Sequence, residues 1–158
     1  MTEFLVFADS HGYVRDMAAV ILENERIDNI IFLGDGVRAV KSLREEFTKK
    51  KFTLILGNND AGEQNEYDAA NFVILNVENA KIGLCHGHLF KVKTSIFDLT
   101  AHGERAGLSA VLFGHTHIQK LERTKSGMLI LNPGSIMGDA YAILTVDGSN
   151  VDAGLYKR

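Results

Sequence analysis

The sequence has a single cysteine, no tryptophan, one proline and no long hydrophobic run. One cysteine cannot form a disulfide within the chain, so the fold does not depend on an oxidising compartment. No apolar stretch approaches the roughly 20 residues needed to cross a bilayer, and the first residues lack the basic and apolar regions of a secretion signal. We therefore expect a cytoplasmic protein without a membrane contact.

A strong charge of one sign is also missing, since the formal net charge is only −3. This value argues against a dedicated nucleic-acid surface, which needs clustered Lys and Arg to follow the phosphate backbone. A small phosphate substrate stays compatible, because bound divalent cations would reverse the sign of a local site. The 158 residues, 46% of them hydrophobic, suit one domain spanning residues 1–158.

The first third of the chain alternates apolar runs with amphipathic helical segments. Runs at 4–7, 29–33 and 52–56 are separated by two helical patterns, which predicts a β-α-β-α-β unit with parallel strands. Further strands are expected at 72–77, 81–84 and 109–113, with a helix ending near Gly107. The C-terminal part is expected to be one meander, with strands at 119–123, 128–131, 141–146 and 151–156. The predicted architecture is mixed α/β, with two sheets packed face to face and helices outside.

Polar side chains gather in five loops that each follow an apolar strand. Carboxyl ends of parallel strands meet at one edge of a sheet, where α/β proteins bind ligands. Five of the six histidines lie in these loops, and the sixth, His102, is expected to be exposed on a helix. The loops are Ala8-Asp9-Ser10-His11-Gly12, Gly34-Asp35-Gly36, Gly57-Asn58-Asn59-Asp60, Cys85-His86-Gly87-His88 and Gly114-His115-Thr116-His117.

Carboxylate and imidazole groups without thiolates are typical ligands of Mn, Fe, Ni, Co or Zn. The pairs Asp9/His11 and His115/His117 are spaced two apart, which places both side chains on one side of an extended segment. Two cations roughly 3.5–4 Å apart need a bridging carboxylate, and Asp35 between two glycines is the natural candidate.

Each motif alone also has a structural explanation. Asp35 fits a simple turn, and so does the segment 57–60, because Asn and Asp tolerate left-handed backbone. Gly34-x-Gly36 lacks the third glycine of a dinucleotide-binding loop. The five loops together, in this order, favour a metal centre.

These motifs resemble the signature of the calcineurin-like metallophosphoesterases, which the chain matches at Asp9-x-His11, Gly34-Asp35, Gly57-Asn58, His86 and Gly114-His115-x-His117. The small size, His86-Gly87-His88 and Asn132-Pro133-Gly134-Ser135 resemble the small prokaryotic phosphodiesterase branch of that family. The resemblance implies a four-layer α-β-β-α sandwich of two mixed sheets. It also implies a metal-dependent phosphoesterase, and by its branch a phosphodiesterase, in which a hydroxide bridging two metals attacks the phosphorus in line.

The resemblance also implies two divalent ions, with manganese expected first and nickel, zinc, iron or cobalt as alternatives. One metal would be held by Asp9, His11, Asp35 and His117, and the other by Asp35, Asn58, His86 and His115. Asp35 would bridge the two ions.

One position departs from the family pattern. Many members carry a histidine, thought to protonate the leaving group, where this chain has Asn59, and an amide cannot act as a general acid near neutral pH. We expect His88 or a metal-bound water to take this role, although His88 could instead only support a ligand. Asn58, Asn59 and His88 are the expected substrate contacts. The loops 61–70, 89–94 and 136–140 are expected to form the pocket, with Tyr67 and Phe90 as walls or as packing residues.

A rival hypothesis is a catalytically silent protein of the same fold that acts through protein contacts. Loss of catalysis usually removes ligands, whereas all seven positions here carry a residue able to coordinate. A second rival is a metal-dependent hydrolase of another bond. Cys85 is read as a buried core residue and not as a nucleophile. The natural substrate, the metal and association into a homo-oligomer stay open.

Overall fold

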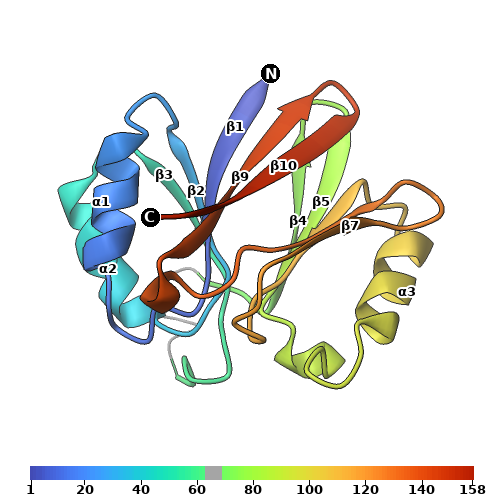
Figure 1. Ribbon diagram of the computed structural model, residues 1–158, viewed down its shortest axis with the longest axis horizontal. Helices are drawn as coiled ribbons and strands as arrows, with labels where there is room; N and C mark the ends of the chain where they lie inside the picture. The colour runs from blue at the N-terminus through green and yellow to red at the C-terminus, as the bar shows by residue number, and fades with distance from the viewer. Residues whose placement is uncertain (63–68) are drawn as a thin grey trace.

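The computed structural model describes residues 1–62 and 69–158 and arranges them in four layers (Figure 1). Two five-stranded mixed sheets pack face to face, with two helices outside one sheet and a third helix outside the other. The expected α-β-β-α architecture is therefore confirmed. In the described part of the chain, no helix is long and apolar enough to span a membrane.

The first sheet has the strand order β10-β9-β1-β2-β3. Strands β1 (Thr2–Phe7), β2 (Asn29–Phe32) and β3 (Lys51–Leu54) run parallel. Strand β9 (Ala140–Asp147) is antiparallel to β1, and β10 (Asn150–Lys157) to β9. Helices α1 (Arg15–Glu23) and α2 (Val37–Glu46) connect the parallel strands and cover the outer face, as the sequence predicts.

Alternation of side chains along β1 builds two cores at once. Leu5 and Phe7 point to the layer of α1 and α2, whereas Phe4 and Val6 join the layer between the sheets. Helix α1 buries Met17, Val20 and Ile21. The apolar pattern of residues 14–22 predicts that Leu22 shares the buried face with Met17 and Ile21, but Leu22 is instead 55% exposed. It follows Ile21 by one residue and lies at the edge of the apolar stripe.

The second sheet has the order β4-β5-β6-β8-β7. Its strands are β4 (Phe72–Val77), β5 (Ala80–Cys85), β6 (Ala110–Leu112), β7 (Lys120–Arg123) and β8 (Leu129–Asn132). The central strands β5, β6 and β8 are parallel, and both edge strands are antiparallel to their neighbours. Helix α3 (Phe97–Arg105) covers the outer face, and short 3-10 turns follow β5 (η1, His88–Phe90) and β8 (η2, Ile136–Gly138).

The predicted C-terminal meander is wrong as a single unit. The hairpin β7–β8 belongs to the second sheet, while the hairpin β9–β10 belongs to the first. The segment after β8 crosses between the two sheets, and β8 itself pairs in parallel with β6. Turn residues indicate which neighbouring strands form a hairpin, but they carry no information about the sheet that the hairpin joins.

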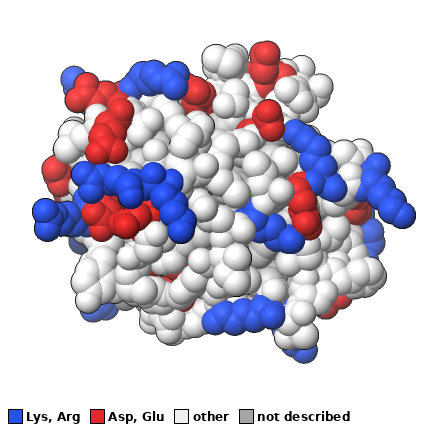
Figure 2. All heavy atoms as spheres, in the orientation of Figure 1, with Lys and Arg blue, Asp and Glu red and all other residues white. Residues whose placement is uncertain are grey.

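The loops after β1, β2, β3, β5 and β6 converge at the carboxyl ends of both sheets, toward the lower edge in Figure 1. The face drawn in Figure 2 carries basic and acidic side chains intermingled with wide neutral areas. Among the described residues, no region of one charge sign covers that face.

Candidate metal centre

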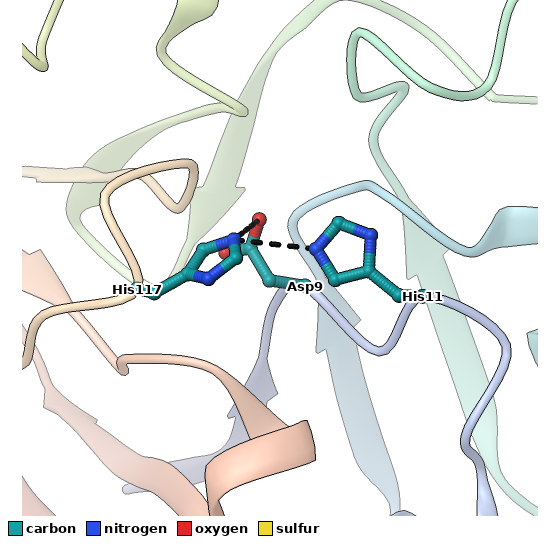
Figure 3. A group of neighbouring side chains, drawn as sticks. All are labelled: Asp9, His11 and His117. Atoms are coloured by element: carbon teal, nitrogen blue, oxygen red, sulfur yellow. Dashed lines mark hydrogen bonds and ion pairs between the residues drawn. The ribbon is translucent and has the colours of Figure 1, made fainter.

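Three of the predicted ligands, Asp9, His11 and His117, form the first cluster at this edge (Figure 3). The Nε2 atoms of His11 and His117 lie 3.2 Å apart, and Nε2 of His117 lies 3.3 Å from Oδ1 of Asp9. Asp9 is fully buried, whereas both histidines are exposed. The cluster therefore has a buried carboxylate at its base and two imidazoles at its rim.

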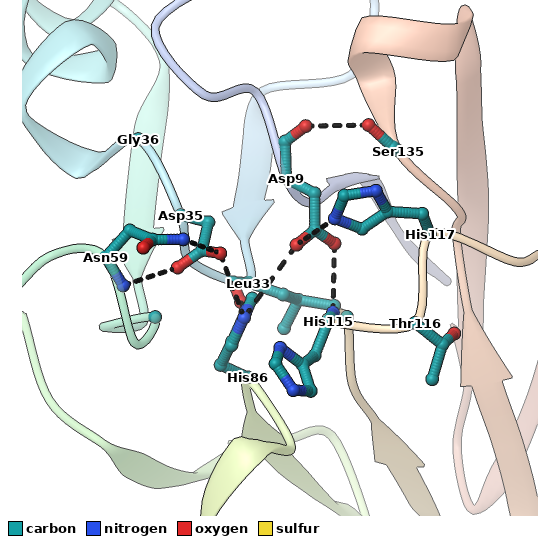
Figure 4. Close-up of polar contacts among 12 residues, drawn as sticks. Asp9, Leu33, Asp35, Gly36, Asn59, His86, His115, Thr116, His117 and Ser135 are labelled. Carbon is teal, nitrogen blue, oxygen red and sulfur yellow. Dashed lines mark hydrogen bonds and ion pairs between the residues drawn. The ribbon is translucent and has the colours of Figure 1, made fainter. Parts of the chain in front are cut away.

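A second cluster contains Asp35, His86 and His115 (Figure 4). Nε2 of His86 lies 3.5 Å from Oδ2 of Asp35, and the rings of His86 and His115 have centroids 5.0 Å apart. The Nδ1–H of His86 donates to the backbone oxygen of Leu33 at 2.7 Å. This hydrogen bond fixes the tautomer and leaves Nε2 free to face the cluster.

The two clusters are neighbours, because Nε2 of His86 lies 3.8 Å from Oδ1 of Asp9. The structure thus brings together six of the seven predicted ligands, divided between two groups as the resemblance implies. Asp35 lies in the second group only, and Asn58 is exposed in the turn after β3. A bridging position of Asp35 and a ligand role of Asn58 therefore stay predictions.

Two buried atoms of the clusters, Oδ1 of Asp9 and Nε2 of His86, have no hydrogen-bond partner among the described residues. A buried polar atom without a partner costs about 1–3 kcal/mol, and coordination to a cation would remove this cost. Carboxylates and imidazoles without a thiolate suit borderline divalent metals. The residues present therefore fit divalent metal ions at this site.

The carboxylates and His86 shift one another's proton affinities. Burial raises the pKa of Asp9, although the positive charges of His86 and His117 oppose this. Burial also acts to raise the pKa of Asp35, but the adjacent His86 and the two hydrogen bonds from Asn59 outweigh it and hold that pKa well below its usual range. Burial acts to lower the pKa of His86, but the nearby carboxylates of Asp35 and Asp9 outweigh it and raise that pKa.

Two other histidines have lowered pKa values. Burial, followed by the charges of His86 and Lys93, lowers the pKa of His115 to about 4. Burial and then the charge of His86 lower the pKa of His88. Both rings are therefore mostly neutral at pH 7, which is the form in which imidazole binds metals.

Asp60 is a buried site residue to which the sequence alone assigned no role. Its carboxylate accepts four backbone N–H groups, from Asp35 (2.7 Å), Gly36 (2.9 Å), Val37 (3.0 Å) and Gly57 (2.8 Å). It therefore joins the loops after β2 and β3 to the start of α2 and holds the backbone of Asp35 in place. The sequence signal was its position at the end of the Gly57-Asn58-Asn59 turn.

The segment Asn132-Pro133-Gly134-Ser135 holds two loops of the site in place through hydrogen bonds. The amide of Asn132 donates to the backbone oxygen of Gly114 (2.8 Å) and to the hydroxyl of Thr116 (3.0 Å). The hydroxyl of Ser135 donates to the backbone oxygen of Asp9 (2.7 Å; Figure 4). This segment thus connects the His115–His117 loop and the Asp9 loop to the end of β8.

The predicted substrate contacts occupy different places around the clusters. Asn59 donates from its backbone and its amide to both oxygens of Asp35 (2.9 and 2.7 Å), which positions that carboxylate. His88 is half-buried, with its ring 5.5 Å from that of His86 and 6.1 Å from that of His115. Asn58 is exposed in the same turn as Asn59.

Of the two aromatic residues expected as pocket walls or as packing residues, Phe90 lies in the described chain and packs against other rings. Tyr67 lies outside the described residues. Phe90 packs against Phe72 and His102, with ring centroids 6.1 and 5.4 Å away. His102 also meets Phe72 edge-on at 5.1 Å, so its predicted exposure is wrong: the ring is half-buried in an aromatic cluster. Cys85, in contrast, is buried as predicted, and burial raises the pKa of its thiol to about 12.

Three hollows surround the clusters. One of about 630 Å³ lies beside His11 and Asp35 and includes Arg38 and Asn59. One of about 540 Å³ lies beside His117 and includes Met137 and Gly138, and one of about 620 Å³ is lined by 92–96 and by Thr116. Two of the loops predicted to form the pocket, 89–94 and 136–140, therefore contribute lining residues.

With this fold and this pair of clusters, the chain belongs to the calcineurin-like phosphoesterase superfamily, whose domain model matches residues 2–149. A probable metallophosphoesterase of Bacillus subtilis is 29% identical over 162 residues, which cover 98% of this chain and 90% of the relative. Membership in this family supports a metal-dependent hydrolase of phosphate esters.

Two solved structures share the fold at lower identity. An archaeal phosphodiesterase is 19% identical with a TM-score of 0.71 and covers 98% of this chain and 100% of its own. Zinc-bound Vps29 of Entamoeba histolytica is 19% identical with a TM-score of 0.73 and covers 99% of both chains.

Proposed function

We propose that the protein is a phosphodiesterase that acts with two divalent cations, manganese being the first candidate. The observation that carries the proposal is the pair of adjacent clusters, in which Oδ1 of Asp9 and Nε2 of His86 are buried, lie 3.8 Å apart and have no hydrogen bond. Two sites separated by a few ångströms are the arrangement that in-line displacement at phosphorus requires.

Each cluster would hold one cation. Asp9, His11 and His117 would hold the first, and Asp35, His86 and His115 the second. In this proposal Asp35 also reaches the first ion and Asn58 completes the second set. Cations bound there supply an activated water and neutralise charge on the phosphoryl oxygens.

The remaining polar side chains would orient the substrate and the ligands. Asn59 holds Asp35 through two hydrogen bonds and so fixes the direction of its oxygens. His88 and Asn58 would contact the phosphate group. The fold neighbour named as an archaeal phosphodiesterase supports a diester as the substrate.

A second candidate is a silent relative that acts through protein contacts, because Vps29 shares the fold. Exposed apolar side chains lie next to the first cluster, with Tyr13 at 66%, Ile118 at 70% and Met137 at 50% exposure. Such side chains suit a protein partner as well as a substrate. Six of the seven expected ligands nevertheless lie together in the two clusters, and this favours the enzyme.

The variant Asp35→Asn tests the metal site. We expect it to lower turnover of bis-p-nitrophenyl phosphate by about 10²-fold or more, because losing a charged ligand weakens binding of the second ion. The bound metal is measured by atomic emission, and the fold by thermal unfolding. Asp98→Asn, on the exposed first turn of α3, removes the same charge away from the site. It should change neither the turnover nor the bound metal. Full activity and full metal content in Asp35→Asn would contradict the assigned site.

A further inference from the structure

The hollow beside the His115–His117 loop has features that the hydrolysis itself does not use. Its volume of about 620 Å³ falls within the range of small-molecule sites. Thr116 lines it and points away from Asp9 and Asp35 in Figure 4. The opposite wall is the segment 92–96 between η1 and α3. This hollow therefore adjoins the loop that carries two of the proposed ligands.

The lining combines an apolar wall with polar groups that can bind an anion. Val92 and Phe113 are buried in the wall, and Ile118 forms an exposed apolar rim. The hydroxyl of Ser95 accepts a hydrogen bond from the backbone of Phe97 (3.1 Å), which leaves its own proton free to be donated.

Two lysines line this hollow, and their surroundings differ. Lys120 is paired with Glu122 at 2.9 Å. Lys93 is exposed, and no carboxylate forms an ion pair with it within residues 1–62 and 69–158. Lys93 is therefore the cation that this hollow can offer to a ligand.

Lys93 lines the same hollow as Thr116, which lies between the proposed ligands His115 and His117 in the chain. The neighbouring hollow beside His117 shares Ile118 and Gln119 with this one. A ligand held at the clusters can therefore extend past Ile118 toward Lys93.

We propose that this hollow is a subsite for a second phosphate group of the substrate and that Lys93 binds that group. The preferred substrates would then be phosphodiesters that carry a further phosphate on one of their alcohols, with a sugar or ring against Val92 and Phe113. The inference rests on the proposed phosphodiesterase function and narrows its substrate class. Ammonium–phosphate contacts are charge-assisted hydrogen bonds, which makes Lys93 a specificity residue and not a catalytic one.

Two diesters with the same scissile bond test the subsite. Thymidine 5′-(p-nitrophenyl phosphate) and its 3′-phosphorylated form differ by one remote phosphate and release the same p-nitrophenolate. We expect the metal-loaded wild type to favour the phosphorylated diester in kcat/KM by about fivefold, the size of one exposed charge pair. Lys93→Gln should bring this ratio close to one. Lys125→Gln, in the exposed turn between β7 and β8, removes the same charge outside the hollow and should keep the ratio.

A binding measurement separates this inference from the proposed function. Calorimetry compares thymidine 3′,5′-bisphosphate with thymidine 5′-monophosphate, with and without added metal. Tighter binding of the bisphosphate to wild type than to Lys93→Gln supports the subsite. If this result is found but no diester is hydrolysed, only the phosphodiesterase proposal fails. Equal binding of the two nucleotides by wild type, or an unchanged preference in Lys93→Gln, overturns the subsite while hydrolysis of bis-p-nitrophenyl phosphate stands by itself.

Discussion

Five residues of the metal centre have a left-handed backbone conformation. Their φ angles are 54° for Asp9, 45° for His11, 62° for Asp35, 67° for His115 and 61° for His117. Each such non-glycine residue costs roughly 1 kcal/mol and persists only where the surroundings impose it. The hydrogen bonds that Asp60 accepts and that Asn132 and Ser135 donate, described above, provide that support. The strain is concentrated at the residues that face the proposed ions.

This backbone conformation corrects one argument from the sequence. The spacing of His115 and His117 suggests an extended segment with both rings on one side. The loop is instead left-handed at both residues, and the two rings lie in different clusters. The identity of the ligands was predictable because Asp and His after apolar strands form a recognisable pattern. Their backbone conformation was not predictable, because neither Asp nor His as a residue type predicts a positive φ.

The role of His88 can be tested through pH. Burial lowers the pKa of His88, so its protonated fraction is small at pH 7 and grows only as the pH falls below the ordinary imidazole value of about 6.5. If His88 donates a proton, His88→Gln should slow a diester with a phenolate leaving group more than one with p-nitrophenolate, and only at acidic pH. The measurement is the pH dependence of kcat/KM for both diesters. An equal loss for both at every pH would mean that His88 is not the proton donor.

At the scale of elements, the site depends on loops that approach each other closely. The sequence indicated which strands precede the loops, because each apolar run ends at a glycine-rich polar segment. It gave no indication that the Asp60 carboxylate turns back to four N–H groups around α2, since this contact exists only after β2 and β3 pair. Contacts of this kind depend on tertiary structure and leave no periodic signal in the chain.

Gly57 is the point of closest approach between these loops. A Cβ atom at this position would overlap the side chain and backbone of Asp35. We therefore expect Gly57→Ala to lower the metal content and to destabilise the fold by about 1–3 kcal/mol, the usual cost of overpacking.

Gly138 provides the matched control, because a Cβ there meets nothing within 4 Å and its φ is not positive. Gly138→Ala should stay within about 0.5 kcal/mol of wild type in urea unfolding and keep its metal content. If the two variants had the same stability and the same metal content, the close approach of Gly57 to Asp35 would not be required for either property.

At the scale of the whole molecule, the sandwich brings two separate sheets to one edge. The loops after β1, β2 and β3 carry Asp9, His11, Asp35 and Asn58, while the loops after β5 and β6 carry His86, His115 and His117. Each cluster therefore takes ligands from the loops of both sheets. The layered architecture was predictable from the apolar runs and the family resemblance. The assignment of the C-terminal hairpins to different sheets was not, because it depends on which edge each hairpin joins.

The measurement that tests the central claim most directly is hydrolysis after removal and return of metal. The protein is stripped with a chelator, and Mn, Ni, Zn or Mg is added back singly while turnover of bis-p-nitrophenyl phosphate and p-nitrophenyl phosphate is followed. Because the two clusters suit a pair of divalent ions, we predict no turnover without metal and a restored activity that is faster on the diester. Metal binding at both clusters with no turnover of either ester by any of these ions would contradict the account and favour the silent relative.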